Sequence, residues 1–175
     1  NQALKFHSQG NILEAARCYQ QIINKGCNDH RVFSNFGAIL RGLGKSQEAE
    51  NSYLKAIKLN PNFAEAHFNL GNTLKDLGNL QDAEKSYRKA IQLNPDFAEA
   101  HFNLGTILRK QNNLDESIRS YEKAIKSNKN LKIAIAEIGI IMTIKGNYKE
   151  GLQKINEGHG SILFDHITPA MKIQC

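Results

Sequence analysis

The chain of 175 residues is 41% hydrophobic, which is enough apolar material to order it throughout, and its three cysteines form no metal-binding or redox spacing. Such a sparse, odd set of cysteines indicates a reducing compartment, and we therefore expect a cytoplasmic protein without a metal or a cofactor. The net charge of +6 is spread without a long basic run, and no apolar run reaches the roughly 18 residues of a membrane span, so neither a nucleic acid nor a membrane is an expected partner.

The sequence repeats itself with a constant period. The segment FAEAHFNLG occurs at 63–71 and again at 97–105, which sets the period at 34, and each copy follows an Asn-Pro pair. Such a period predicts tandem units, each of which buries its apolar face only against its neighbours. Residues 1–29 fit the later part of such a unit, and we expect this first unit to be truncated.

Glycine recurs at the same period in two series with different expected roles. Members of the first series lie inside helical patterns, where glycine costs up to about 1 kcal/mol relative to alanine, so we expect them to let two helices approach closely. Members of the second series lie between two helical patterns, where Gly or Asn supplies the left-handed residue that ends a helix. The first series comprises Gly37, Gly71, Gly105 and Gly139, and the second comprises Gly10, Gly44, Gly78, Asn112 and Gly146.

Each complete unit is therefore predicted to be a pair of antiparallel helices. In the unit that begins at Ala64, core residues follow the helical spacing i, i+3, i+4, i+7 from His67 to Leu74. A second helical pattern follows a short turn at Gly78 and stops at Asn94-Pro95, because the residue before proline disfavours helical geometry. The predicted helices span 31–43, 47–59, 64–77, 81–93, 98–111 and 115–127.

The repeating unit resembles the tetratricopeptide repeat (TPR). Its first helix reads HFNLGNTL at 67–74, and its second helix places Ala83 four residues before Tyr87. These positions follow the TPR signature W-x2-L-G-x2-Y followed by A-x3-F, with His67 in place of its Trp, Leu74 in place of its Tyr and Tyr87 in place of its Phe. The resemblance implies an all-α fold, an α-solenoid of helix-turn-helix units wound as a right-handed superhelix. It divides the chain into a truncated first TPR at 1–29, complete TPRs at 30–63, 64–97 and 98–131, a degenerate TPR at 132–157 and a non-TPR tail at 158–175.

The first helix of each unit carries a second stripe of residues beside its core face. The resemblance implies that this stripe lines the concave groove in which TPR proteins bind extended peptides. Its aromatic residues are expected to be exposed as apolar anchors, with partial burial against the neighbouring helix as the alternative. Its basic row favours acidic or C-terminal segments, although Glu65 and Glu99 offset it. The expected peptide-binding residues are Asn35, Asn69, Asn103, Phe68, Phe102, Asn72, Thr106, Arg41, Lys75 and Arg109.

Asparagine recurs at one position of this stripe. Asn35, Asn69 and Asn103 keep the period of 34, although Asn is a poor residue inside a helix, about 0.7 kcal/mol below Ala. The amide offers donors and an acceptor that match the C=O and N–H of a peptide, so a row of amides can hold a backbone without reading side chains. The row is similar to the asparagine ladder in the TPRs of protein O-linked sugar transferases. The alternatives are a solvated polar face, or residues shared because the units were copied.

The first helix of the last unit, near 132–144, is apolar nearly all round, which predicts burial on all sides. We expect the tail at 158–175, which contains the apolar run ILF at 162–164, to fold back as a cap. The alternatives are cover by a downstream domain, or by a second chain in a homodimer formed through residues 133–164. The groove-side positions that need this cover are Ile133, Ala136, Ile140 and Ile144.

The repeats contain no recognisable catalytic triad, phosphate-binding loop or paired-carboxylate site, so we expect no enzymatic activity. His67 and His101 occupy a large core position of the first helix and are expected to pack rather than to bind a metal. The predicted function is a protein–protein interaction scaffold that binds an extended peptide or protein segment. The alternatives are a substrate-recruiting TPR domain of a larger glycosyltransferase- or oxygenase-like enzyme, and self-association through the last unit.

Overall fold

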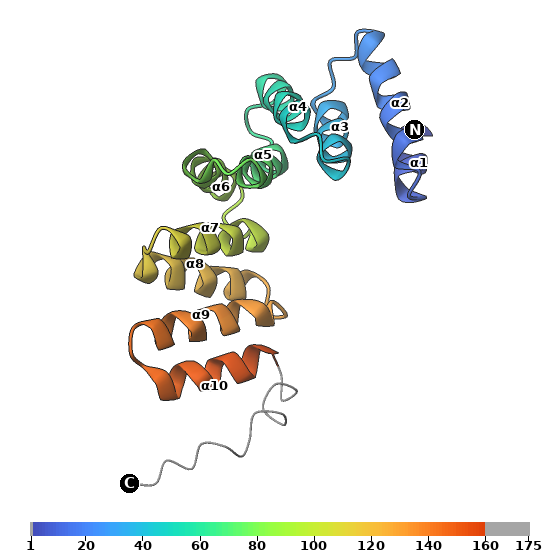
Figure 1. Cartoon of the computed structure of the whole chain (residues 1–175). Helices are drawn as coiled ribbons and strands as arrows, with labels where there is room; N and C mark the ends of the chain where they lie inside the picture. The colour runs from blue at the N-terminus through green and yellow to red at the C-terminus, as the bar shows by residue number, and fades with distance from the viewer. Residues whose placement is uncertain (1, 160–175) are drawn as a thin grey trace, which may run out of the picture. The chain divides into compact units, whose positions relative to one another are not determined.

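The computed structural model describes residues 2–159, and all regular structure in that range is α-helical, which confirms the predicted all-α fold. The chain divides into two compact units, Asn1–Pro95 and Asp96–Cys175, which are described separately. Within each unit, successive helices pack against one another in pairs (Figure 1). No helix in the described range is both long and apolar enough to cross a membrane.

The N-terminal unit contains three helix pairs. Polar residues mark helix starts in this unit. Asp29, for example, caps the helix that begins at His30, because its side chain accepts a hydrogen bond from the backbone N–H of Arg31 at 2.9 Å. The four helices predicted in this unit are correct to within one residue at each end. The helices are α1 (Gln2–Ser8), α2 (Ile12–Asn24), α3 (His30–Gly42), α4 (Ser46–Leu59), α5 (Ala64–Asp76) and α6 (Leu80–Leu93).

The C-terminal unit contains two further pairs. The two helices predicted for residues 98–131 are again correct to within one residue. The last helix continues two residues beyond 157, where the degenerate repeat was expected to end, and the remainder of the expected tail, 160–175, lies outside the described residues. The helices are α7 (Ala98–Lys110), α8 (Leu114–Ser127), α9 (Lys132–Ile144) and α10 (Tyr148–His159).

The turns within the pairs use the second glycine series as predicted. A left-handed residue lets the chain leave one helix and reverse direction, and it strains any residue that carries a Cβ. The backbone φ is 76° at Gly10, 75° at Gly44, 81° at Gly78, 64° at Asn112 and 87° at Gly146, which confirms the prediction.

The first glycine series provides space for tyrosine rings. A Cβ on Gly71 would lie 2.7 Å from Cε1 of Tyr87, far closer than real contacts allow. The close approach expected of these glycines is therefore confirmed, and in the complete pairs the group that comes close is an aromatic ring of the second helix. The equivalent contacts are Gly37 with Tyr53 and Gly105 with Tyr121, each at 2.9 Å.

The core of each unit lies between its helices and is built around these tyrosines. In the C-terminal unit, Tyr121 packs with Ile138 and Ile141 of α9, so a ring from one pair also meets the first helix of the next pair. Alanines on the second helices, such as Ala83 and Ala124, are fully buried where the helices are closest. The largest fully buried side chains include Tyr19, Tyr53, Tyr87 and Tyr121.

The helices α9 and α10 lie side by side in the last pair (Figure 1), and their backbones approach closely. A Cβ on Gly139 would lie 2.5 Å from the carbonyl oxygen of Gly151, and a Cβ on Gly158 would lie 2.5 Å from the amide nitrogen of Ala136. Ile155 stands at the register position of the tyrosine. Gly151 and Gly158 stand one repeat period after Ser117 and Ala124, so the departures of this repeat from the earlier ones accompany a second, closer type of helix packing.

Candidate functional site

The three asparagines of the predicted ladder lie at equivalent positions on the first helices of their pairs. Asn35 lies on α3, Asn69 on α5 and Asn103 on α7, and each is half-buried. Within the N-terminal unit α3 contacts α5, so Asn35 and Asn69 belong to neighbouring helices. An amide in this position can both donate to and accept from a peptide unit.

The hydroxyl of Tyr19 lies behind the amide of Asn35. Burial raises the pKa of Tyr19, and the nearby Asn35 side chain offsets part of that rise. The phenol is therefore protonated at neutral pH. The Tyr19 hydroxyl is buried and makes no hydrogen bond of full geometry within residues 2–159. Asn35 thus lies close to Tyr19, and its half-buried side chain remains partly exposed.

The two predicted aromatic anchors are half-buried, so the expectation that they are exposed is wrong. The ring centroids of Phe68 and Tyr87 lie 5.9 Å apart with planes tilted by 47°, and those of Phe102 and Tyr121 lie 5.4 Å apart with a tilt of 53°. Tilted pairs at this separation are favourable beyond their buried area. The ring that meets each phenylalanine belongs to the second helix of the same pair.

Asn72 and Thr106 contact the tyrosine hydroxyls of their own pairs. The hydroxyl of Tyr87 donates to Oδ1 of Asn72 at 2.8 Å, and Oη of Tyr121 lies 3.1 Å from Oγ1 of Thr106. Asn72 is only 7% exposed. These two side chains therefore join the helices of a pair, and their proposed contact with a ligand remains a prediction.

Two of the three predicted basic residues are paired with acids. Nε of Arg41 lies 2.6 Å from Oδ2 of Asp76, which joins α3 to α5. Nε of Arg109 lies 3.1 Å from a carboxylate oxygen of Glu137 on α9, at an angle that falls short of a hydrogen bond. The third, Lys75, is half-buried and forms no ion pair with any residue in 2–159. The row is therefore largely neutralised, by acids other than Glu65 and Glu99.

Glu137 is a residue of this face that the sequence reasoning missed. It stands one repeat period after Asn103, so it occupies the fourth position of the asparagine series. Its side chain is 19% exposed, which for a carboxylate requires a charged partner, supplied here by Arg109. The repeat period alone is enough to locate Glu137, but a series defined by its asparagines does not include a glutamate.

The groove-side positions of α9 differ from one another in burial. Ala136 is buried because the backbone at Gly158 packs against it. Ile140 is half-buried, whereas Ile133 and Ile144 are 48% and 57% exposed. The expected cap at 158–175 is described only at residues 158 and 159, which are part of α10.

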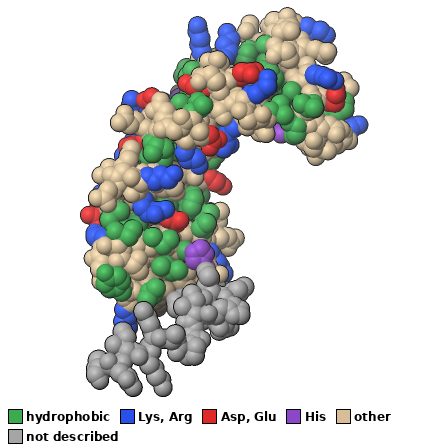
Figure 2. Space-filling view, in the orientation of Figure 1, with side chains coloured by type: hydrophobic (Ala, Val, Ile, Leu, Met, Phe, Trp, Pro, Cys, Tyr) green, Lys and Arg blue, Asp and Glu red, His purple; other side chains and the backbone are tan. Residues whose placement is uncertain are grey.

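The histidines and other charged residues assemble no further site in the part of the chain that the structure describes. Nε2 of His67 lies 3.0 Å from the carbonyl oxygen of Pro61, and His101 is buried. No group of three potential metal ligands occurs within residues 2–159. Figure 2 shows Lys and Arg interspersed with Asp and Glu on the face in view.

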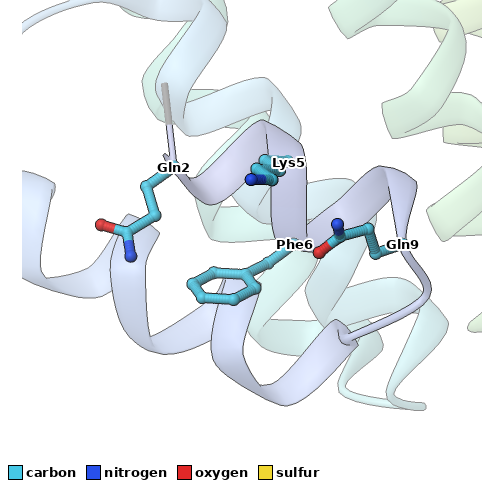
Figure 3. Close-up of a pocket in the computed structure, with 4 residues that line it drawn as sticks. All are labelled: Gln2, Lys5, Phe6 and Gln9. Atoms are coloured by element: carbon cyan, nitrogen blue, oxygen red, sulfur yellow. The ribbon is translucent and has the colours of Figure 1, made fainter.

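A hollow beside α1 is lined by Gln2, Lys5, Phe6 and Gln9 (Figure 3). Phe6 also packs against the core cluster of the N-terminal unit. The lining therefore comes from one helix and the residue that follows it, and it contains none of the predicted peptide-binding residues.

Two family models match the repeats. The tetratricopeptide-repeat model matches residues 64–97 and 98–131, and a second TPR model matches residues 37–78. Together the matches span 37–131, more than half of the 175 residues. No curated protein matches the sequence.

Solved structures of similar fold cover most of the chain. A crystal structure of MamA is 24% identical, with the match covering 91% of this chain and 93% of that chain at a TM-score of 0.84. YrrB, described as a TPR protein with an unusual peptide-binding site, is 20% identical over 94% of this chain and 84% of its own, with a TM-score of 0.77. PilF of Pseudomonas aeruginosa is 17% identical over 90% and 72%, with a TM-score of 0.81. At these identities the likeness concerns the fold.

Proposed function

Because the chain belongs to the tetratricopeptide-repeat family, we propose that it is a scaffold that binds an extended peptide or protein segment along the first helices of its pairs. The observation that carries this proposal is the half-buried asparagine at one position of three consecutive units, Asn35, Asn69 and Asn103. Their amides are suited to holding a peptide backbone. On this proposal the row acts like the asparagine ladder of the TPRs of protein O-linked sugar transferases.

The charges beside these amides support recognition of a backbone rather than of a charged side chain. Arg41 and Arg109 each have an acid within ion-pair distance. An acidic peptide would have to compete with those acids for the guanidinium groups. An amide is itself uncharged and both donates and accepts hydrogen bonds, so the asparagines are the polar groups best suited to a neutral main chain.

Half-buried aromatic side chains supply the apolar part of the proposed contact. Phe68 and Phe102 adjoin the ladder in sequence, and each is half-buried and so remains partly exposed. Partly exposed aromatic groups beside polar ones are common anchors for peptides. The fold is shared with YrrB, whose description mentions a peptide-binding site.

We further propose that the chain is not itself an enzyme, needs no cofactor and works in the cytoplasm. The free thiols of Cys18 and Cys27 fit a reducing compartment. Assays for hydrolase and transferase activity on peptides that bind would test the first point, and turnover abolished by a single polar substitution would contradict it.

Selection of decapeptides from a phage-displayed library against the intact chain tests peptide binding directly. We expect enriched peptides to bind, and the triple variant Asn35→Ala, Asn69→Ala, Asn103→Ala to bind them at least about tenfold more weakly, since each lost hydrogen bond contributes roughly 1 kcal/mol. Calorimetry gives the affinities, and circular dichroism checks that helicity is unchanged. No enrichment, or a triple variant with wild-type affinity, would reject the proposal.

A matched control changes three exposed asparagines that lie on second helices, Asn24→Ala, Asn51→Ala and Asn156→Ala. This variant also loses three side-chain amides, but none of them belongs to the ladder. We expect it to bind the selected peptides like the wild type. A loss equal to that of the ladder variant would show that the effect is not specific to the first helices.

Self-association is a second candidate function, favoured by exposed apolar side chains in the C-terminal unit. Ile133, Ile144, Tyr148 and Leu152 are between 48% and 67% exposed. Sedimentation equilibrium over a range of concentrations tests this, with a mass that doubles as the supporting result. Recruitment of substrate for a larger modifying enzyme is the third candidate, and a catalytic domain in the same reading frame would favour it.

A further inference from the structure

The complete helix pairs treat their buried tyrosine hydroxyls in two ways. In α5–α6 the hydroxyl of Tyr87 donates to Asn72 at 2.8 Å, and in α7–α8 the hydroxyl of Tyr121 lies 3.1 Å from that of Thr106. The residue at this register in α3 is Ala38, one repeat period before Asn72. Alanine has no polar side-chain atom, so the tyrosine of this pair lacks the partner that its two counterparts have.

Tyr53 is nevertheless seated like the other tyrosines. A Cβ on Gly37 would lie 2.9 Å from both Cε1 and Cζ of its ring, which places the hydroxyl end of the ring beside this part of α3. The hydroxyl makes no hydrogen bond to any residue in 2–159, yet it is not among the polar atoms there that are both buried and unpartnered. The hydroxyl therefore retains only a small solvent-accessible area, since the whole side chain is 1% exposed.

This hydroxyl is a neutral hydrogen-bond donor at physiological pH. Burial raises the pKa of Tyr53 to about 12, against the opposing charge of Arg41. Arg41 itself is paired with Asp76 at 2.6 Å, so the surroundings of the hydroxyl carry little net charge. An uncharged acceptor is the group that such a donor binds without a large desolvation cost.

We propose that Tyr53 and Ala38 form a subsite that takes a carbonyl oxygen of the bound peptide, which the Tyr53 hydroxyl binds as donor. The inference rests on the proposed peptide-binding function and assigns a specific contact within it. In the next pair the amide oxygen of Asn72 already fills this role, and Thr106 does so in the pair after it. The repeat at 30–63 thus differs from its neighbours in leaving this hydrogen bond to the ligand.

Two substitutions remove the subsite in different ways. Tyr53→Phe deletes the hydroxyl and keeps the ring against Gly37. Ala38→Asn installs the partner that the next pair contains, so the chain itself then accepts the hydrogen bond. Decapeptides selected on the intact wild-type chain should bind both variants roughly three- to tenfold more weakly, the effect of one hydrogen bond.

The matched control is Tyr87→Phe, which deletes the same atom where it is already bound within the protein. It should lower the melting temperature, and because it removes no hydrogen bond to the ligand it should weaken binding of the selected peptides less than Tyr53→Phe does. Tyr53→Phe should show the reverse, because no internal hydrogen bond is lost. Thermal unfolding followed by circular dichroism separates the two, and it identifies any variant whose weaker binding reflects unfolding.

The outcomes separate this inference from the function on which it rests. If no decapeptide is enriched, the proposed function fails and the subsite with it. If peptides bind and depend on the ladder asparagines, but Tyr53→Phe and Ala38→Asn bind like the wild type, only the subsite is overturned. A Tyr53 effect that survives replacement of each Asn and Gln of the peptide by Ala identifies a main-chain carbonyl, and one that disappears identifies a side-chain amide.

Discussion

The ring of Tyr87 lies where a side chain on Gly71 would have to be, with Cε1 2.7 Å and Cδ1 2.8 Å from the position of a Cβ. We therefore expect Gly71→Ala to destabilise the protein by about 1–2 kcal/mol. Overpacking of this kind costs roughly 1–3 kcal/mol, and the higher helix propensity of alanine returns up to about 1 kcal/mol. Urea unfolding measures the difference.

Gly42→Ala is the matched control for this substitution. Gly42 is the last residue of α3, and a Cβ there would meet nothing within 4 Å. The same chemical change should therefore be neutral or stabilising by up to about 1 kcal/mol, since only helix propensity acts. Equal destabilisation by both variants would contradict the assignment of Gly71 to ring packing.

Gly151→Ala should be more damaging than Gly71→Ala. Its Cβ would lie 2.6 Å from Cγ2 of Thr143 and 2.7 Å from the carbonyl oxygen of Gly139, and a backbone atom cannot turn aside as a ring can. The helices α9 and α10 would have to separate, which we expect to cost about 3 kcal/mol, at the upper end of overpacking penalties. Hydrogen exchange should show the loss confined to the C-terminal unit, with exposed Gln153→Ala as an unaffected control.

The pair formed by Arg109 and Glu137 should contribute more than a surface ion pair. Their side chains are 30% and 19% exposed, compared with 73% and 50% for Arg17 and Glu14. We expect a coupling free energy of about 1–2 kcal/mol for the former and below about 0.5 kcal/mol for the latter. Double-mutant cycles with Arg→Gln and Glu→Gln measure both, and equal coupling in the two pairs would show that burial does not strengthen the first.

Gly78 should tolerate asparagine better than alanine. Its φ is 81°, and the equivalent residue of the next unit is Asn112, at 64°. Gly78→Ala should destabilise the protein by about 1 kcal/mol. The left-handed conformation strains a residue with a Cβ, and the lower conformational entropy of alanine in the unfolded chain offsets only part of that cost. Gly78→Asn should cost less than half as much, since Asn adopts this conformation readily. Melting temperatures of the two variants would rank them, and the opposite order would refute the argument.

The repeat period was enough to predict most of the fold. It placed six helix ranges to within one residue, and it identified the left-handed turns from Gly10 to Gly146, because both depend on local chemistry that recurs in every unit. It also indicated close approach at Gly71. It could not name Tyr87 as the approaching group, since that depends on how the two helices of a pair are rotated against each other.

The candidate site was harder to predict because its side chains are defined by their partners. Asn72 reads as a groove residue from spacing alone, but the hydroxyl of Tyr87 holds it inside the pair. The sequence pattern suggests that Arg41 is a free cation, but in the structure it pairs with Asp76 of α5. These contacts join positions far apart in sequence, and a pattern along one helix carries no information about them.

The ion pairs of Arg41 and Arg109 have a consequence for how fast a ligand arrives. Opposite charges held close together produce little field beyond the Debye length of about 8 Å at physiological ionic strength, so they cannot draw a peptide in from solution. These two arginines should therefore add little to an association rate of about 10⁵–10⁷ per molar per second, and replacing either by Gln should change its salt dependence little. The lifetime of the complex, rather than the speed of encounter, would distinguish one peptide from another.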